Sequence, residues 1–197
     1  MYNNIKLNVQ SCDGKYISPS FISLLGVRQG DNLSPTLFNI FVNDLPRIFD
    51  DTCKPVSVGN VFINCMLYAD DLVIMSESNQ GLQEAMNKLG NYCDRWGLEV
   101  NINKTKFNVS KKHTSINVKL IFKGKYIEMV DTAKYLGIEF SNDGNTQVAK
   151  SDLYNRALKA CFKLTRALKP LPTPSTSLHL FDHLIKPILL YGSLVSN

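Results

Sequence analysis

The sequence predicts an α+β fold with a helical C-terminal part, and three patterns support this class. Residues 56–76 are rich in β-branched and aromatic side chains around a short acidic turn, which is typical of paired strands. Apolar residues at helical spacing from 82 to 96 predict an amphipathic helix that stops at Gly97. After Gly144 the pattern is helical, apart from a proline-rich break at 170–174. Because the order of strands and helices is mixed, the α+β class fits best.

The first part of the chain predicts a hairpin and then a helix. Short β-like stretches within 1–25 are broken by Asp13-Gly14, which indicates a hairpin. The glycine-bounded loop 26–33 follows. Ser34 and Pro35 then predict the N-cap and the first position of a helix. Apolar residues at helical spacing continue to residue 45, and we expect Pro46 to kink or end this helix.

Later elements follow from the same rules. Residues 61–68 and 72–75 predict two strands joined by a tight acidic turn, and short strands with polar turns are expected over 98–140. One helix is expected at about 146–168 and another from 175 to about 190.

Composition excludes several classes of protein. The chain has 197 residues, of which 44% are hydrophobic and 20% charged, as in ordinary globular proteins. Its apolar runs fall far short of the roughly 20 residues that a membrane helix needs. The N-terminus has no secretory apolar core, so we expect an intracellular protein without a membrane segment. The five cysteines form no Cys-x-x-Cys pair, which argues against a zinc site or a disulfide framework.

Charge is distributed unevenly along the chain. Residues 1–98 carry a balance of −3 and residues 99–197 a balance of +8, within a total of +5. This division suggests metal or substrate chemistry in the first half and contact with a polyanion in the second. A solvated basic surface would explain the same asymmetry.

Two adjacent carboxylates are the sharpest candidate for chemistry. Asp70 and Asp71 lie between two apolar runs, where like charges resist being brought together. Such a pair can bind a divalent cation through hard oxygen ligands. Asp-Asp is also a common dipeptide of solvated turns, but a turn of that kind does not need apolar flanks.

A loop and a helix supply two further candidates. In the loop, Gly26 and Gly30 would let the backbone approach a ligand closely, while Arg28 and Gln29 could meet phosphate and base or sugar edges. An ordinary strand-to-helix connection is the alternative. In the helix, four basic residues recur on one face and favour contact with a phosphate backbone, although a solvated amphipathic helix would look the same: Arg156, Lys159, Lys163 and Arg166.

Four segments in order and spacing resemble a known family. They are Gly-Val-Arg-Gln-Gly-Asp-Asn-Leu-Ser-Pro-Thr-Leu-Phe at 26–38, Tyr-Ala-Asp-Asp at 68–71, Gly-Leu-Glu-Val-Asn-Ile-Asn-Lys-Thr-Lys at 97–106 and Lys-Tyr-Leu-Gly-Ile at 134–138. Together they resemble the palm motifs of reverse transcriptases from non-LTR (LINE-type) retrotransposons. The Leu-Tyr-Gly-Ser segment at 190–193 is similar to the thumb side of the same enzymes. The resemblance covers essentially the whole chain.

The resemblance implies a fold and an activity. It implies a partial right-hand palm of antiparallel strands with helices over 1–140, followed by a helical thumb-like segment over 141–197. It implies an RNA-directed DNA polymerase that transfers nucleotides to a primer 3′-OH with two Mg²⁺ ions. The partners would be an RNA template, a DNA primer and deoxynucleoside triphosphates, with no membrane, and nuclear access is expected from the family alone.

It also implies residue roles. Asp70 and Asp71 would be the catalytic metal ligands, and Tyr68 would lie beside the primer–template. Gln29 and Gly30 would line the site for the incoming nucleotide and template, with Arg28 nearby. Lys104 matches a lysine proposed as general acid for the pyrophosphate leaving group, and the alternative is a solvated lysine at the end of a strand without a catalytic role. The primer-gripping hairpin and the thumb helix would contain the remaining residues: Lys134, Tyr135, Leu136 and Gly137 in the hairpin, and Arg156, Lys159, Lys163 and Arg166 in the helix.

One expected motif has no match in the chain. The family's palm has a further aspartate on a strand before the glycine loop, and the only acid before residue 31 is Asp13, in a turn. The fingers region is not matched either. Because two-metal catalysis needs carboxylates from both strands, we expect little or no polymerase activity from this chain alone. A non-catalytic nucleic-acid-binding remnant is the second hypothesis, and metal-dependent nucleotide incorporation would separate the two.

Overall fold

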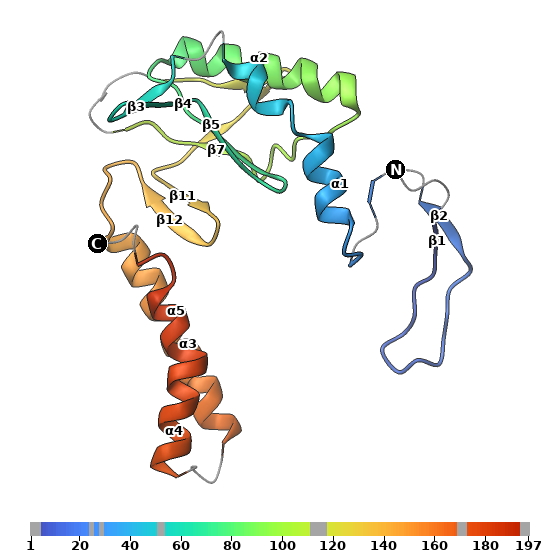
Figure 1. Cartoon of the computed structure of the whole chain (residues 1–197), viewed down its shortest axis with the longest axis vertical. Helices are drawn as coiled ribbons and strands as arrows, with labels where there is room; N and C mark the ends of the chain where they lie inside the picture. Colours follow the sequence, from blue (N-terminus) through green and yellow to red (C-terminus); the bar gives the residue numbers. More distant parts are fainter. Residues whose placement is uncertain are drawn as a thin grey trace. The chain divides into compact units, whose positions relative to one another are not determined.

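The computed structural model describes residues 5–23, 26–27, 30–50, 54–110, 118–168 and 173–193. The chain divides into two compact units, Met1–Leu98 and Glu99–Asn197. The division coincides with the change from a net charge of −3 to one of +8. Both units combine helices with small sheets, so the predicted α+β class is confirmed (Figure 1). The expected boundary between 140 and 141 stays a prediction.

Hairpins and helices make up the described part of the first unit. Its strands pair antiparallel, as β1 (Ile5–Leu7) with β2 (Phe21–Ser23), β3 (Val56–Val58) with β4 (Val61–Ile63), and β5 (Cys65–Tyr68) with β6 (Asp71–Ile74). Its helices are α1 (Ser34–Phe41), the 3-10 helix η1 (Leu45–Phe49) and α2 (Asn79–Trp96).

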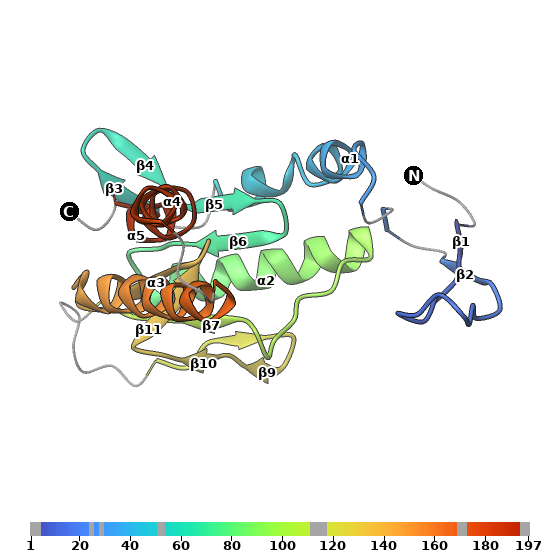
Figure 2. The same ribbon diagram turned by 90° about the horizontal axis from the view of Figure 1, so that it is seen from below.

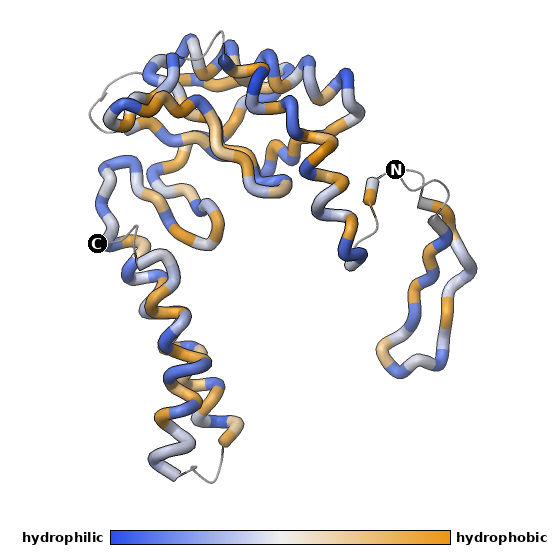
Figure 3. Tube along the Cα trace, viewed as in Figure 1, coloured by the Kyte–Doolittle hydropathy of each residue, from blue (hydrophilic) through white to orange (hydrophobic). Residues whose placement is uncertain are grey.

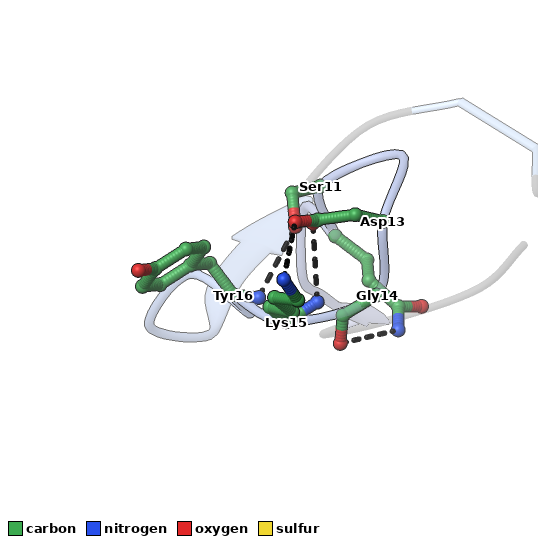
Figure 4. Close-up of polar contacts among 6 residues, drawn as sticks. Ser11, Asp13, Gly14, Lys15 and Tyr16 are labelled. Atoms are coloured by element: carbon green, nitrogen blue, oxygen red, sulfur yellow. Dashed lines mark hydrogen bonds and ion pairs between the residues drawn. The ribbon is translucent and has the colours of Figure 1, made fainter.

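The β1–β2 hairpin confirms the first predicted element, and Asp13 closes its far end. The Asp13 Oδ1 atom accepts hydrogen bonds from the Ser11 hydroxyl at 2.5 Å and from the Lys15 amide at 3.2 Å (Figure 4). These two bonds, the one from Ser11 above all, lower the pKa of the Asp13 carboxyl below its usual value. The Asp13 carboxylate therefore stabilises the turn in which it lies.

The predicted start of α1 is wrong by one residue. Leu33 is the N-cap and Ser34 is already helical, with no side-chain cap bond. Asp31 explains the difference, because its Oδ1 accepts a hydrogen bond from the Leu33 amide at 2.9 Å and its carbonyl accepts one from the Ser34 amide at 3.2 Å. The turn closed by Asp31 carries Ser34 into the first helical position.

The predicted end of α1 is also too late. The helix ends at Phe41, and the expected Pro46 lies inside η1 instead. The Leu45 amide donates to the Val42 carbonyl at 3.0 Å, which is the tighter spacing of a 3-10 turn. Pro46 has no amide hydrogen and restricts the residue before it, so an α-helix cannot run through this point.

The core of the first unit forms between α2 and η1. Phe49 of η1 has no exposed surface, and Ala85, Leu89 and Tyr92 of α2 are buried. The α2 helix begins with the Ser78 hydroxyl accepting a hydrogen bond from the Gly81 amide and ends at Gly97, as predicted. It runs along the β5–β6 hairpin (Figure 2). The η1 helix contacts both α2 and β5, so the hairpin is connected to this core through η1.

Replacing Tyr92 with phenylalanine is expected to destabilise the first unit by about 1–3 kcal/mol. The Tyr92 hydroxyl donates a 2.7 Å hydrogen bond to the Asp44 carboxylate, which the variant leaves without this donor. Urea unfolding followed by the fluorescence of Trp96, the single tryptophan, measures the change. Equal stability of the two proteins at pH 7 would show that the hydrogen bond between Tyr92 and Asp44 does not stabilise the unit.

The same variant should flatten an alkaline loss of stability. Burial of Tyr92, followed by its hydrogen bond with Asp44 and the charge of that carboxylate, raises the pKa of the hydroxyl. The native state then keeps a proton that the unfolded state releases above about pH 10, so stability falls as pH rises through this range. The slope between pH 9 and 10.5 should be smaller in Tyr92→Phe than in the wild type.

The described part of the second unit begins with short strands, as predicted for 98–140. Three pairs form: β7 (Lys106–Phe107) with β10 (Glu128–Met129), β8 (Ile121–Phe122) with β9 (Lys125–Tyr126), and β11 (Thr132–Tyr135) with β12 (Ile138–Ser141). The β7–β10 pair is parallel, which departs from the expected antiparallel arrangement. Its strands lie far apart in sequence, so a tight turn does not dictate their direction.

Helices complete the second unit. The α3 helix (Gln147–Ala167) agrees with the predicted 146–168. The last predicted helix begins one residue early and is divided into α4 (Pro174–Leu180), a π turn (Phe181–Ile185) and α5 (Lys186–Leu190). Pro187 explains the wide turn, because its ring would clash with the carbonyl four residues earlier in a regular helix. Over the described ranges, no helix is long and apolar enough to cross a membrane.

Candidate metal-binding hairpin and nucleic-acid interface

The β5–β6 hairpin presents the predicted pair of carboxylates. Tyr68 pairs with Asp71 across the strands, so the connecting loop consists of Ala69 and Asp70 alone. The predicted strand 61–68 is divided at Asn64, which lies between β4 and β5. The Asn64 side chain donates a hydrogen bond to the Asp50 carboxylate at 3.0 Å, and its carbonyl accepts one from the Met75 amide at 2.7 Å. These bonds hold the open end of the hairpin.

Both carboxylates are exposed at the closed end. Among the residues that the structure describes, neither the Asp70 nor the Asp71 carboxylate has a hydrogen-bond or ion-pair partner, in contrast to that of Asp13. The described ranges also contain no cluster of three acidic, histidine or cysteine side chains that could hold a metal ion. Mg²⁺ is commonly held by one or two carboxylates together with water and substrate phosphates. The two aspartates fit that donor set.

Tyr68 accompanies Asp71 on one face of the hairpin. Residues that pair directly across two strands project to the same side, so the Tyr68 ring flanks the Asp71 carboxylate. The ring is 64% exposed, although it is large and aromatic. Leu67 and Leu72 pair on the opposite, half-buried side. The hairpin therefore has one face held by the core and one open face that carries a tyrosine and a carboxylate.

Ala69 has an unusual backbone conformation at the tip of the hairpin. Its φ angle is +50°, in the left-handed region that side chains other than glycine rarely adopt. Such positions store strain and cluster at functional sites. The strain lies directly beside Asp70.

Replacing Ala69 with glycine is expected to raise the free energy of unfolding by about 0.5–1 kcal/mol, because glycine adopts this φ without a steric penalty. The control is Ala85→Gly in the buried part of α2, where the same change should lower stability. Thermal unfolding measures both variants. A loss of stability in Ala69→Gly would show that the turn is not strained.

The other residues predicted for the catalytic site are only partly described. Arg28 and Gln29 lie outside the described residues. Gly30 is exposed with φ at +84°, and a Cβ built there has no neighbour within 4 Å among the described atoms. Lys104 is exposed in the second unit, and its amide donates to the carbonyl of Asn101 at 3.1 Å. Lys104 therefore belongs to a different unit from Asp70 and Asp71.

The hairpin expected around residues 134–138 is present as β11–β12. Tyr135 pairs with Ile138, which leaves Leu136 and Gly137 as a two-residue loop. Their φ angles are +46° and +80°, the signs of a type I′ turn. Lys134 pairs across the strands with Glu139, with 3.5 Å between the charged atoms, and lies 3.7 Å from the Asp152 carboxylate of α3. Ion pairs thus link the hairpin to the helix.

The basic residues of α3 have two different environments. Arg156 forms an ion pair with Asp152 at 2.9 Å and donates a 2.7 Å hydrogen bond to the Gly137 carbonyl. Lys159, Lys163 and Arg166 are exposed and have no ion-pair partner within the described part of the chain. A separate stripe of α3, roughly a quarter to a third of a turn around the helix from these cations, buries Ala149, Leu153 and Ala157. Polar and apolar segments alternate along the helical part of the second unit (Figure 3). The three exposed cations remain available for a polyanion.

Comparisons with known proteins identify the family. The family model described as "Reverse transcriptase (RNA-dependent DNA polymerase)" matches residues 4–140. The Retrovirus-related Pol polyprotein from type-2 retrotransposable element R2DM of Drosophila melanogaster is 32% identical over 163 residues, covering 78% of this chain and 15% of the relative. The probable RNA-directed DNA polymerase from transposon BS of the same species is 27% identical over 186 residues, covering 85% and 19%.

A third relative is also a polymerase of a mobile element. The RNA-directed DNA polymerase from mobile element jockey of Drosophila melanogaster is 29% identical over 120 residues, covering 57% of this chain and 13% of the relative. The chain therefore belongs to the reverse transcriptases, as part of the polymerase domain of a non-LTR, LINE-type retrotransposon. It spans about 15% of the length of the first relatives that it matches. Reverse transcriptases generally use divalent metal ions, typically Mg²⁺.

Two hydrogen bonds between distant parts of the sequence were not predicted. Tyr191 donates a hydrogen bond to the Leu136 carbonyl at 2.6 Å, and Asp44 accepts one from Tyr92 at 2.7 Å. The available signal for the first was the Leu136-Gly137 pair between two strands, which predicts a tight turn but not its partner. A tyrosine followed by glycine near the end of the chain gave no indication of that contact.

Proposed function

We propose that this chain supplies the metal-binding hairpin and the primer-binding part of an RNA-directed DNA polymerase. The observation that carries the proposal is the β5–β6 hairpin, which presents Asp70 and Asp71 without partners among the described residues, in a chain matched by the reverse transcriptase family model. In the intact domain, the reaction transfers a nucleotide to the 3′-OH of a DNA primer on an RNA template. The substrates are deoxynucleoside triphosphates.

Each residue has a defined task in this proposal. Asp70 and Asp71 would contribute carboxylate ligands to the two Mg²⁺ ions of the intact domain, and these ions would supply charge neutralisation and Lewis acidity at the reacting phosphate. Tyr68, on the same face as Asp71, orients the primer–template beside the carboxylates. Arg28, Gln29 and Gly30 bind the incoming nucleotide and the template. The Lys104 ammonium donates a proton to the pyrophosphate leaving group.

The second unit would hold the nucleic acid as a palm edge and thumb. The turn of the β11–β12 hairpin contacts the primer, and the exposed cations of α3 bind phosphates: Lys159, Lys163 and Arg166. The +8 charge balance of residues 99–197 favours this division of labour.

Primer extension on an RNA template with Mg²⁺ tests the catalytic half of the proposal. We propose that this chain by itself shows little or no incorporation, because two carboxylates alone give an incomplete two-metal site. Incorporation by the wild-type chain that Asp70→Asn abolishes would overturn the proposed inactivity and establish Asp70 as a working residue. Incorporation that survives in Asp70→Asn would overturn the metal-binding role.

Duplex binding tests the other half. The triple variant Lys159→Gln, Lys163→Gln, Arg166→Gln should bind a primer–template more weakly and lower the slope of log K against log salt concentration by about 2–3. Lys150→Gln is the matched control, because Lys150 is exposed on the opposite side of α3. Equal effects of the control and the triple variant would overturn the assignment of this face. Binding without incorporation in every form of the domain would favour a non-catalytic remnant.

A further inference from the structure

The loop of the β11–β12 hairpin is held by side chains from outside the hairpin. In a two-residue loop, the carbonyl oxygens of the loop residues take no part in the strand ladder and are free to accept hydrogen bonds from other groups or from water. Here the Leu136 carbonyl accepts a 2.6 Å hydrogen bond from Tyr191, and the Gly137 carbonyl accepts a 2.7 Å bond from Arg156. The two partners come from α3 and from the residue after α5. Both loop carbonyls are therefore satisfied by the helical part of the unit.

Packing reinforces these hydrogen bonds. The Tyr191 ring lies against the loop, since a Cβ at Gly137 would be 3.4 Å from its Cε1 atom and 3.7 Å from its hydroxyl oxygen. The next residue, Gly192, lies so close to Ile138 that any Cβ there would overlap the Ile138 side chain. The chain after α5 is thus in direct contact with both the loop and the first residue of β12.

Arg156 is in turn oriented by a charge network. Its guanidinium donates to Gly137 and pairs with Asp152 one helical turn earlier, and Asp152 also lies within ion-pair distance of Lys134 on β11. A planar guanidinium can serve two such acceptors at fixed angles. The positive charge of Arg156 therefore interacts with groups of the protein itself, Asp152 and the Gly137 carbonyl.

We propose that Tyr191 and Arg156 are positioning residues that fix the conformation of the Leu136-Gly137 turn for primer binding. This inference rests on the proposed function of the β11–β12 hairpin. It separates Arg156 from the phosphate-binding cations of α3, with which the sequence grouped it. The left-handed φ of Leu136 needs such external support, because leucine rarely adopts that conformation.

Hydrogen–deuterium exchange of residues 132–141 in the full chain tests the positioning directly. Tyr191→Phe keeps the ring and removes the hydroxyl, and Arg156→Gln removes the guanidinium. Each should exchange about fivefold faster than the wild type in this segment, the change expected from one lost hydrogen bond. Tyr154→Phe, an exposed tyrosine of α3, is the control and should leave exchange unchanged. Unchanged exchange in Tyr191→Phe would overturn the proposal even if Arg156→Gln unfolds the unit.

The salt dependence of primer–template binding separates positioning from phosphate contact. Tyr191→Phe and Arg156→Gln should weaken binding with the slope of log K against log salt unchanged, whereas Lys163→Gln should lower that slope by about 0.7–0.9. A slope change in Arg156→Gln equal to that in Lys163→Gln would overturn the assignment of Arg156. If the wild-type chain binds no duplex, the proposed function fails together with the role in primer binding. The exchange data still decide whether the two residues hold the turn.

Discussion

A double variant, Asp70→Asn with Asp71→Asn, is expected to bind Mn²⁺ at least about tenfold more weakly than the wild-type chain. Each carboxylate attracts a divalent ion with an energy of about 2 kcal/mol at 4 Å even in water, and about 1.4 kcal/mol corresponds to a factor of ten. Both aspartates are exposed and their carboxylates have no hydrogen-bond or ion-pair partner in the described part of the protein, so the negative charges can attract the ion. Electron paramagnetic resonance of free Mn²⁺ measures the affinity.

Asp13→Asn is the matched control for this measurement. Asp13 is also exposed and acidic, but its carboxylate already accepts hydrogen bonds from Ser11 and Lys15. The control should therefore leave Mn²⁺ affinity unchanged. An equal loss in the control and in the double variant would mean that Mn²⁺ responds to net charge and that the β5–β6 hairpin is not a metal site.

Truncating Phe49 to alanine is expected to destabilise the first unit by about 3–5 kcal/mol, the range measured for fully buried phenylalanine. Phe49 has no exposed surface and belongs to η1, which contacts both α2 and β5. A loss of this size is a large part of the stability of an ordinary domain. We therefore expect the β5–β6 hairpin to lose its support together with the core.

The control for Phe49 is another phenylalanine of the same unit. Phe62 lies on β4 and is 72% exposed, so Phe62→Ala should change stability by no more than about 0.5 kcal/mol. Urea unfolding followed by Trp96 fluorescence compares both variants. Similar losses in the two would contradict a core centred on η1 and α2.

Local patterns predicted much of the fold. The end of α2 at Gly97, the extent of α3 and the β5–β6 hairpin all agree with the sequence because spacing and turn chemistry determine them locally. The borders of α1 could not be predicted, since the side chain of Asp31 competes with Ser34 for the first turn. The π turn before Pro187 depends in the same way on backbone sterics that hydrophobic spacing does not report.

The candidate site likewise has a part that the sequence predicts and a part that it does not. The exposure and pairing of Asp70, Asp71 and Tyr68 follow from a short hairpin that the sequence predicts. The hydrogen bond from Arg156 to Gly137 could not be predicted, because the four basic residues of α3 form a uniform stripe in the sequence. Only tertiary structure distinguishes a cation that binds a carbonyl of its own chain from one that is free.

The hydrogen bond between Tyr191 and Leu136 also has a consequence for the order of folding. It joins residues 55 positions apart, so closing it requires a long loop, whereas the β11–β12 ladder needs only neighbouring residues. During synthesis the two strands can pair early, but their turn receives its last support only after Tyr191 has left the ribosome. The hairpin thus exists in a nascent, unsupported form for the time that about 50 further residues take to be added, a few seconds at usual elongation rates.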